Sequence, residues 1–448
     1  MFGESTVMTR LQAHQAVSTL PCPMAILAPV RSTFSSRLPW PEPANALSIA
    51  LASLQAGGQM RLNWSESNPR RVFPLEGYEE PELARLFDEA ANLRYEPDPR
   101  GLPHAREALA AHSLLSVDGS SLDASRYFLA ASTSEAYSWL FKLLCDPGDA
   151  VLVPKPGYPL FDFLAGLEGV EARPWRLEYL HPAGWKVDFD SVEEALRGGA
   201  SQRHTSNGRG SSGSGNSGRV KAIILINPNN PTGSFISAEE RRHFVEIATR
   251  EGLALIVDEV FLGFPVEGEG RSFAGEEAAL TFVLDGLSKR LGLPQLKLGW
   301  IAASGPQELL KEALEGLETI ADTFLSAGTP VMNALPALLE AGPRFAHAMG
   351  VRLRANLSML RGELEFPGSP HRVYRCEGGW TAIVESPRYA GEEELALRLL
   401  TEGGLYSQPG HFFDLEREAA FTAGLILQPA RFAEGLQRYR NWYESAAR

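Results

Sequence analysis

The chain has 448 residues, of which 44% are hydrophobic, and a formal net charge of −13 at pH 7. This length exceeds one ordinary core, so we expect two domains, or one large α/β domain with a satellite. The acidic balance argues against a nucleic-acid partner, and the apolar stretch over 21–30 is too short and proline-broken to span a membrane. The composition favours a soluble protein with a small-molecule ligand.

The N-terminal region carries little structural signal, and residues 1–60 are expected to be an extension that wraps around the fold or frays. Three cysteines, Cys22, Cys145 and Cys376, are scattered without the spacing of a zinc site or a disulfide framework. A reducing cytoplasm fits this pattern best.

Apolar strands and amphipathic helices alternate through the middle of the chain. The expected strands cover 127–131, 150–153, 222–226, 253–257 and 281–284, and the expected helices cover 134–144 and 239–250. Ser237 and Glu240 form a capping box at the start of the second helix. This alternation predicts a parallel sheet with helices on both faces.

Residues 201–218, SQRHTSNGRGSSGSGNSG, interrupt the pattern with almost no apolar side chains. Such a segment cannot bury enough surface to offset the cost of ordering, so we expect a flexible surface loop. Its last six residues fit the dinucleotide pattern GxGxxG, but a strand follows them where that site requires a helix. We therefore expect no dinucleotide site here.

The C-terminal part has a Gly-Pro pair at 342–343, a strand-like run over 380–384, and helical patterns near 392–400 and 431–443. These elements favour a smaller α/β unit.

Polar residues follow the expected strands. Asn230 lies in the string NPNNPTG, Asp258 ends the apolar run over 253–257, and Lys289 lies in LSKRLGLP. Ser132 and Tyr158 also come after strands. Ligands of open parallel sheets bind beyond the carboxyl ends of the strands, so we expect these five residues at one site.

The order Asn-Pro-Thr-Gly, then Asp after a strand, then Ser-Lys-x-x-Gly-Leu-Pro resembles the class I and II aminotransferases of fold type I. The resemblance runs from about Tyr95 to Trp300. It implies an α/β fold in which a large domain with a mostly parallel sheet between helices is joined to a smaller α/β domain. It also implies pyridoxal 5′-phosphate as the cofactor and a homodimer with composite sites.

By this resemblance the chain divides into an N-terminal extension and three further parts. Residues 61–95 contribute to the small domain, 96–325 form the large cofactor-binding domain, and 326–448 form the small C-terminal domain.

Pyridoxal phosphate needs a lysine, an acid for its pyridine nitrogen, donors for its phosphate and an aromatic face. The resemblance implies that Lys289 is the catalytic Schiff-base lysine, whose freed amine then acts as the general base. It implies that Asp258 pairs with the pyridinium nitrogen and that Asn230 donates to the ring hydroxyl oxygen.

Further cofactor contacts follow from the same resemblance. Ser132, Thr133 and Ser288 are candidate phosphate ligands, because hydroxyls and N–H groups at a helix N-terminus suit an anion. Tyr158 matches the aromatic residue that stacks on the ring. Tyr95 matches a tyrosine that reaches the phosphate of the neighbouring subunit.

The sequence departs from the family pattern at two cofactor positions. Lys297 stands where an arginine usually binds the phosphate, so the charge is kept while the bidentate fork is lost. Phe261 stands where many members have a tyrosine that contacts the ring oxygen.

The third departure concerns the substrate. The family grips the substrate carboxylate with an arginine in the strand after a Pro-Gly-x-x-Phe motif; here the motif is present at 409–413, but residues 421–427 contain no arginine. The position aligns near Gly424. Arg417 and Arg431 flank the strand and are expected on the surface. Arg375, the segment 67–70 and Trp380 are other candidates for holding the substrate.

The leading hypothesis is an aminotransferase that moves an amino group from an amino acid or amine to a 2-oxo acid, with ordinary dicarboxylates as poor donors. A lyase or cyclase would use the same cofactor and the same lysine. A non-catalytic protein that binds pyridoxal phosphate is the third hypothesis, disfavoured because the whole cofactor constellation persists and no DNA-binding module is appended.

Overall fold

The computed structural model describes residues 35, 37–38, 44–59, 61–72, 87, 90–112, 122–198, 218–417 and 419–446. Apart from Gly218, the predicted loop over 201–218 lies outside these residues, and so does most of the predicted extension over 1–60. No helix among the described residues combines the length and the apolar surface needed to cross a lipid bilayer.

An eight-stranded sheet forms the centre of the larger part, in the order β2-β9-β8-β7-β6-β3-β4-β5. Its strands are β2 (Tyr127–Ala130), β3 (Ala150–Lys155), β4 (Glu171–Leu180), β5 (Gly184–Val187), β6 (Val220–Ile226), β7 (Ala254–Asp258), β8 (Thr281–Gly286) and β9 (Gly299–Ser304). Strands β9 and β5 run antiparallel to their neighbours, and the others share one direction. The predicted mostly parallel sheet is confirmed.

The five predicted strands are present as β2, β3, β6, β7 and β8, with ends shifted by at most two residues. Their apolar runs are buried because both faces of the sheet are covered. The hairpin β4–β5 and strand β9 were not predicted. Strand β4 alternates exposed and buried residues, with Trp175 and Tyr179 facing inward, as expected for a strand with one solvent-exposed face.

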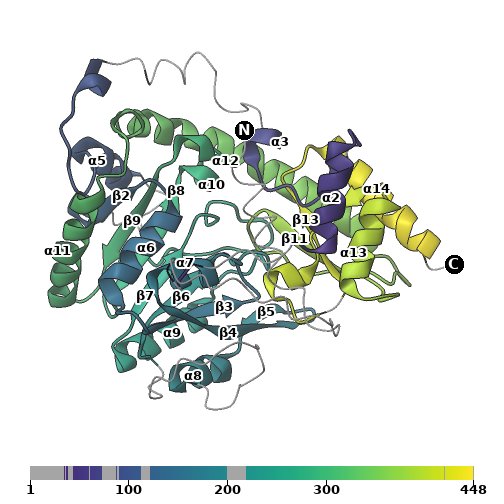
Figure 1. Cartoon of the computed structure of the whole chain (residues 1–448), viewed down its shortest axis with the longest axis horizontal. Helices are drawn as coiled ribbons and strands as arrows, with labels where there is room; N and C mark the ends of the chain where they lie inside the picture. Colours follow the sequence, from purple (N-terminus) through teal and green to yellow (C-terminus); the bar gives the residue numbers. More distant parts are fainter. Residues whose placement is uncertain are drawn as a thin grey trace.

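Helices cover both faces of this sheet (Figure 1). One face carries α6 (Thr133–Leu144), α7 (Phe161–Glu168) and α11 (Gln307–Phe324), and the other carries α5 (Pro103–Ala111), α8 (Phe189–Arg197), α9 (Ala238–Glu251) and α12 (Thr329–Leu364). The capping box of Ser237 and Glu240 is present at α9. Both predicted helices, α6 and α9, are thus confirmed within one residue at each end.

A second group of elements lies at one end of the molecule (Figure 1). It contains a three-stranded antiparallel sheet and the helices packed near it: β10 (Arg372–Val373), β11 (Thr381–Glu385), β13 (Ala420–Gly424), α2 (Ala46–Ala56), α13 (Glu392–Thr401) and α14 (Pro429–Ala446). The short strand β1 (Leu62–Asn63) pairs with β12 (Leu405–Tyr406), so residues from the N-terminal segment join this group. The domain limits at 95/96 and 325/326 stay predictions.

Two features join the groups. Helix α12 has 36 residues and runs through the Gly-Pro pair at 342–343; a Cβ at Gly342 would lie 2.5 Å from Leu291 Cδ2, so a larger residue there would require the leucine side chain to move. The β4–β5 hairpin reaches the small sheet, where the Tyr179 and Tyr374 rings stack with centroids 4.0 Å apart. The β4–β5 end of the strand order is therefore held against the small sheet.

Candidate active site

The candidate residues gather at one edge of the large sheet, as the sequence predicted. Ser132 follows β2, Tyr158 follows β3, Asn230 follows β6, Asp258 ends β7 and Lys289 follows β8. These strands run in the same direction, so their carboxyl ends meet at the same edge.

Asp258 lies at the centre of this edge. The Tyr137 hydroxyl donates a hydrogen bond to its Oδ2 at 3.3 Å, and the Val260 N–H donates to its Oδ1 at 3.2 Å. The pKa of Asp258 is raised to about 7, mainly by burial and in smaller part by the nearby Asp285 charge, while the two hydrogen bonds and the charge of Lys289 oppose this rise. The carboxylate therefore lacks full compensation from the protein alone.

Tyr137 stands beside Asp258, and Tyr158 lies near Tyr137. The rings of Tyr137 and Tyr158 both contact Phe161 edge-on, at centroid distances of 5.4 and 6.2 Å. The sequence suggested Tyr158, but Tyr137 looked like an ordinary core residue of its helix. Its position one turn after Thr133, on a helix that begins at the site, is the signal that identifies it.

Lys289 lies in the one-turn helix α10 (Leu287–Arg290). Its amine nitrogen is 5.5 Å from the ring centroid of Trp380, which comes from the residue before β11. Phe261 and Phe264 pack edge-on against the same indole at 5.3 and 5.2 Å. The small sheet thus supplies an aromatic wall next to the lysine.

Ser132 and Thr133 open helix α6. The Ser132 hydroxyl accepts a hydrogen bond from the Glu135 N–H at 3.2 Å, so it caps the helix. The neighbouring strand approaches closely here, because a Cβ at Gly299 would lie 2.9 Å from Ser132 C and Thr133 N. Glycine at 299 lets β9 pack against this peptide, and the helix start keeps the N–H groups that suit a phosphate.

Asn230 belongs to a turn that its neighbours fix. The Asn229 amide donates to the Pro156 carbonyl at 3.0 Å and to the Thr232 hydroxyl at 2.9 Å, while Asn227 Oδ1 accepts the Ile236 N–H at 3.1 Å. The half-buried Asn230 side chain makes no hydrogen bond with the described residues. Its amide is held at the sheet edge by the turn and is available to a ligand.

The other candidates lie further out. Ser288 is half-buried in α10, whereas Lys297 is exposed with a left-handed backbone at φ 51°. Lys297 precedes Leu298, whose carbonyl accepts the Leu287 N–H at 2.9 Å, so its segment runs beside α10. The Tyr95 side chain is 78% exposed in this subunit. Within the described part of the chain, no hydrogen bond or ion pair joins Lys297 or Tyr95 to the central group.

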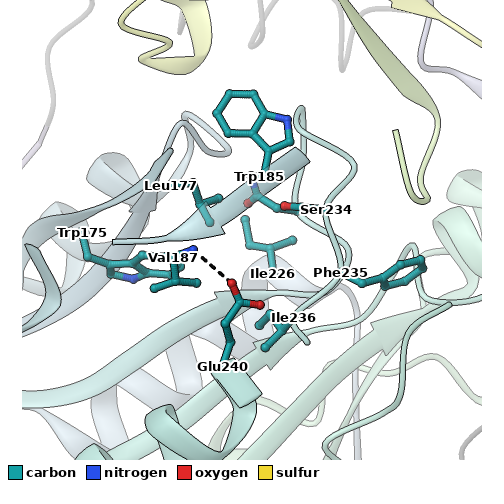
Figure 2. A pocket seen from close by; sticks show the side chains of 10 residues that line it. Trp175, Leu177, Trp185, Val187, Ile226, Ser234, Phe235, Ile236 and Glu240 are labelled. Atoms are coloured by element: carbon teal, nitrogen blue, oxygen red, sulfur yellow. Dashed lines mark hydrogen bonds between the residues drawn. The ribbon is translucent and has the colours of Figure 1, made fainter. Parts of the chain in front are cut away.

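Two cavities lie next to this edge. The first has about 10 Å³, room for roughly one water molecule, and lies between the β4–β5 hairpin and the asparagine turn (Figure 2). Figure 2 also shows the Val187 N–H donating to the Glu240 carboxylate, a bond of 3.1 Å. The second has about 330 Å³, and the Lys155–Asp414 ion pair and Arg417 line it. It adjoins Pro156, two residues before Tyr158.

The position expected for the carboxylate arginine is closed. Gly424 ends β13, its N–H donates to the Trp64 carbonyl at 2.7 Å, and a Cβ there would lie 2.5 Å from the Glu66 carbonyl oxygen. Earlier on the strand, the Thr422 hydroxyl is 2.9 Å from that of Ser65. Backbone and small polar groups of the N-terminal segment occupy the space that a long side chain would need.

Two of the three candidate arginines pair with nearby carboxylates. Arg431 pairs with Glu434 at 2.6 Å on an exposed helix turn, so its predicted surface position is confirmed. Arg417 is exposed, as predicted. Arg375 pairs with Glu377 at 3.3 Å.

Comparison with known proteins agrees with the fold and the motifs. The family model described as aminotransferase class I and II matches residues 72–423. Alanine aminotransferase of Mycobacterium tuberculosis is 28% identical over 295 residues, covering 64% of this chain and 62% of that protein. Nicotianamine aminotransferase B of Hordeum vulgare is 30% identical over 407 residues, covering 84% of this chain and 68% of that protein.

The solved structure of an alanine aminotransferase from Pyrococcus furiosus has a TM-score of 0.75 at 22% identity, covering 89% of this chain and 96% of that one. At this identity the likeness concerns the fold alone.

The chain belongs to the class I and II aminotransferase family. Membership implies pyridoxal 5′-phosphate as the cofactor, and the site fits it. Asp258 is a half-buried acid without full compensation, Asn230 offers an amide, the start of α6 offers N–H groups, and Lys289 offers an amine.

The raised pKa of Asp258 predicts a pH dependence of stability in the protein without cofactor. Between about pH 4 and pH 7 the native carboxyl holds a proton that the unfolded chain, with its ordinary carboxyl pKa near 4, has lost, so native stability falls as pH rises. We expect the free energy of unfolding of the wild type, relative to Asp258→Asn, to fall by about 4 kcal/mol from pH 4 to pH 8, since a pKa raised by about three units corresponds to about 1.4 kcal/mol per unit. Urea denaturation at each pH measures this difference, and a difference independent of pH would contradict it.

The close approach at Gly424 predicts a second effect. Gly424→Ala places a methyl group against the Glu66 carbonyl, so we expect a loss of about 2 kcal/mol in the free energy of unfolding. Gly362→Ala, on a helix with nothing near the added methyl, is the control and should be neutral or stabilising. Equal stability of the two variants in urea would show that Gly424 is not sterically required.

Proposed function

We propose that this protein is an aminotransferase that moves an amino group from an amino acid or an amine to a 2-oxo acid, with Lys289 as the catalytic residue. The observation that carries the proposal is the arrangement of Lys289, Asp258 and Asn230 at one sheet edge. The relatives named alanine and nicotianamine aminotransferase support it, although the chain spans only 62% of the first of them.

Each residue has a proposed task. When bound, pyridoxal phosphate supplies an aldehyde and an electron-withdrawing ring. Asp258 would hold a proton at the pyridine nitrogen, and Asn230 would donate to the ring oxygen. The Lys289 amine would hold the aldehyde and, when free, would move a proton to and from the substrate α-carbon.

The remaining candidates surround these three residues. Ser132, Thr133 and Ser288 are proposed to bind the phosphate through hydroxyl and N–H groups, with Lys297 adding charge. The Tyr158 and Phe261 rings are proposed to flank the cofactor.

We also propose a cytoplasmic homodimer. Cys145 and Cys376 are free thiols, which suits a reducing compartment. Leu93 and Tyr95 are 89% and 78% exposed, and burial against a second subunit would account for two large exposed side chains next to each other.

The dimer proposal is tested by sedimentation of the wild type and of a Leu93→Asp, Tyr95→Asp double variant. We expect a dimer for the wild type and a shift towards monomer with weaker cofactor binding for the variant. A wild-type monomer with full activity would refute composite sites.

The proposed chemistry is tested with full-length protein and Lys289→Ala. The wild type should show visible absorbance with pyridoxal phosphate, which some amino donor converts to the pyridoxamine form and a 2-oxo acid restores. Lys289→Ala should lose the absorbance characteristic of the lysine-bound cofactor and at least about a thousandfold of the activity. Lys311→Ala, which removes an exposed lysine of α11, should retain both.

Other outcomes would favour the alternatives. Release of ammonia without conversion of the cofactor would indicate a lyase or cyclase. Cofactor binding without turnover of any donor would indicate a non-catalytic protein. The aminotransferase names of the relatives do not favour either.

A further inference from the structure

A second group of buried charges lies behind the candidate site, on the other face of the sheet. Side chains alternate along a strand, so Glu259 and Asp285 point to the opposite face from Asp258. Val257 and Val283, at matching positions on β7 and β8, belong to the core under α12, whereas Tyr137 belongs to the core under α6. Glu259 and Asp285 have no exposed surface, and Arg290 is 4% exposed.

Asp285 contacts both ends of the helix that carries Lys289. Its Oδ1 accepts the N–H of Gly286, the residue before α10, at 2.7 Å. Its Oδ2 accepts a hydrogen bond from Arg290 Nε, at the end of α10, and the two form a buried ion pair. One carboxylate thus bridges the residue before the turn and the last residue of the turn.

The Arg290 guanidinium lies in an enclosed space inside the protein. A Cβ at Gly263 would lie 3.4 Å from its Nη1, and glycine leaves that side open for the guanidinium. Glu259 is fixed separately, because it accepts the Ser272 hydroxyl at 2.6 Å and the Phe273 N–H at 2.7 Å. The charge of Arg290 opposes the effect of burial, which raises the pKa of both carboxyls.

A four-residue helix is not stable by itself, because the free-energy cost of forming the first turn exceeds the stabilisation from the hydrogen bonds of one turn. The position of Lys289 therefore depends on contacts outside the helix. The Leu287 N–H, bound to the Leu298 carbonyl at 2.9 Å, fixes the start of the turn. The Arg290 side chain fixes its end.

We propose that Asp285 and Arg290 are positioning residues that clamp α10 and so aim the Lys289 amine at the reacting carbon. The inference rests on the proposed function, because it concerns how well Lys289 performs its task. The clamp acts through the adjacent lysine and touches neither substrate nor cofactor.

The test uses the full-length, cofactor-loaded protein and three variants. Arg290→Met breaks the clamp and leaves Asp285 with an uncompensated charge. The double variant Asp285→Asn, Arg290→Met breaks the clamp and removes that charge as well. Arg290→Lys keeps the charge and loses the guanidinium fork.

Three quantities are measured: stability in urea, kcat and KM for a donor found with the wild type, and the pH midpoint of the visible absorbance of the cofactor. In Arg290→Met we expect lower stability, a kcat lowered at least about tenfold with KM within about threefold, and a midpoint raised by about half a unit. The midpoint rises because the uncompensated Asp285 charge favours a protonated nitrogen at Lys289.

In the double variant, stability and midpoint should return towards the wild type, because no buried charge is left uncompensated. The kcat should stay low, because the turn is still not clamped. Arg290→Lys should recover part of kcat. Arg173→Met removes another buried arginine, paired with Glu171 on β4, and should lower stability with kcat unchanged.

Recovery of kcat together with stability in the double variant would overturn the proposal, as would a folded Arg290→Met with wild-type kcat. If Arg290→Met does not fold, the double variant and Arg290→Lys decide the matter. A wild type that converts no donor would instead refute the proposed function, and the inference with it.

Discussion

The carboxyl edge of the large sheet depends on how buried carboxylates are compensated. A carboxylate removed from water requires donors or a cation, or it takes up a proton. Three acids meet this requirement in three ways at the ends of neighbouring strands: Asp258 with Tyr137 and Val260, Glu259 with Ser272 and Phe273, and Asp285 with Gly286 and Arg290. Each of these sets of contacts fixes a loop or a helix start. The contacts that compensate the carboxylates therefore also set the geometry of the sheet edge.

The three solutions are not equivalent. Asp285 is paired with a full charge, and its pKa is raised only to about 6 despite complete burial. Asp258 and Glu259 each receive two neutral donors, and burial raises the pKa of both to about 7, but of these two only Asp258 is partly accessible. A cation beside Asp258 would bring that pKa down, and the same interaction would strengthen binding of the cation. Because Asp258 is incompletely compensated by the protein, it suits a site that binds a protonated ring.

Much of this arrangement was readable from the sequence because it depends on local patterns. Continuous apolar runs predicted β6, β7 and β8, and the polar residues that follow them predicted which side chains share the edge. The clamp was not readable, because Asp285 and Arg290 are five residues apart and meet only where a strand turns into a single helical turn. Tyr137 was missed because its helix is apolar all along that face, so one functional hydroxyl looks like core.

The absence of the family arginine near Gly424 shows a second limit of predicting a site from motifs. A missing residue in a motif suggests a vacancy, which a nearby arginine should fill. The structure shows no vacancy, because the chain around Trp64 and Glu66 packs against Gly424 and a Ser65–Thr422 hydroxyl pair fills the strand centre. A donor carboxylate cannot be held from this strand as it is elsewhere in the family. At this strand a substrate meets short polar groups and backbone, so an ionic contact to a donor carboxylate must come from another part of the protein.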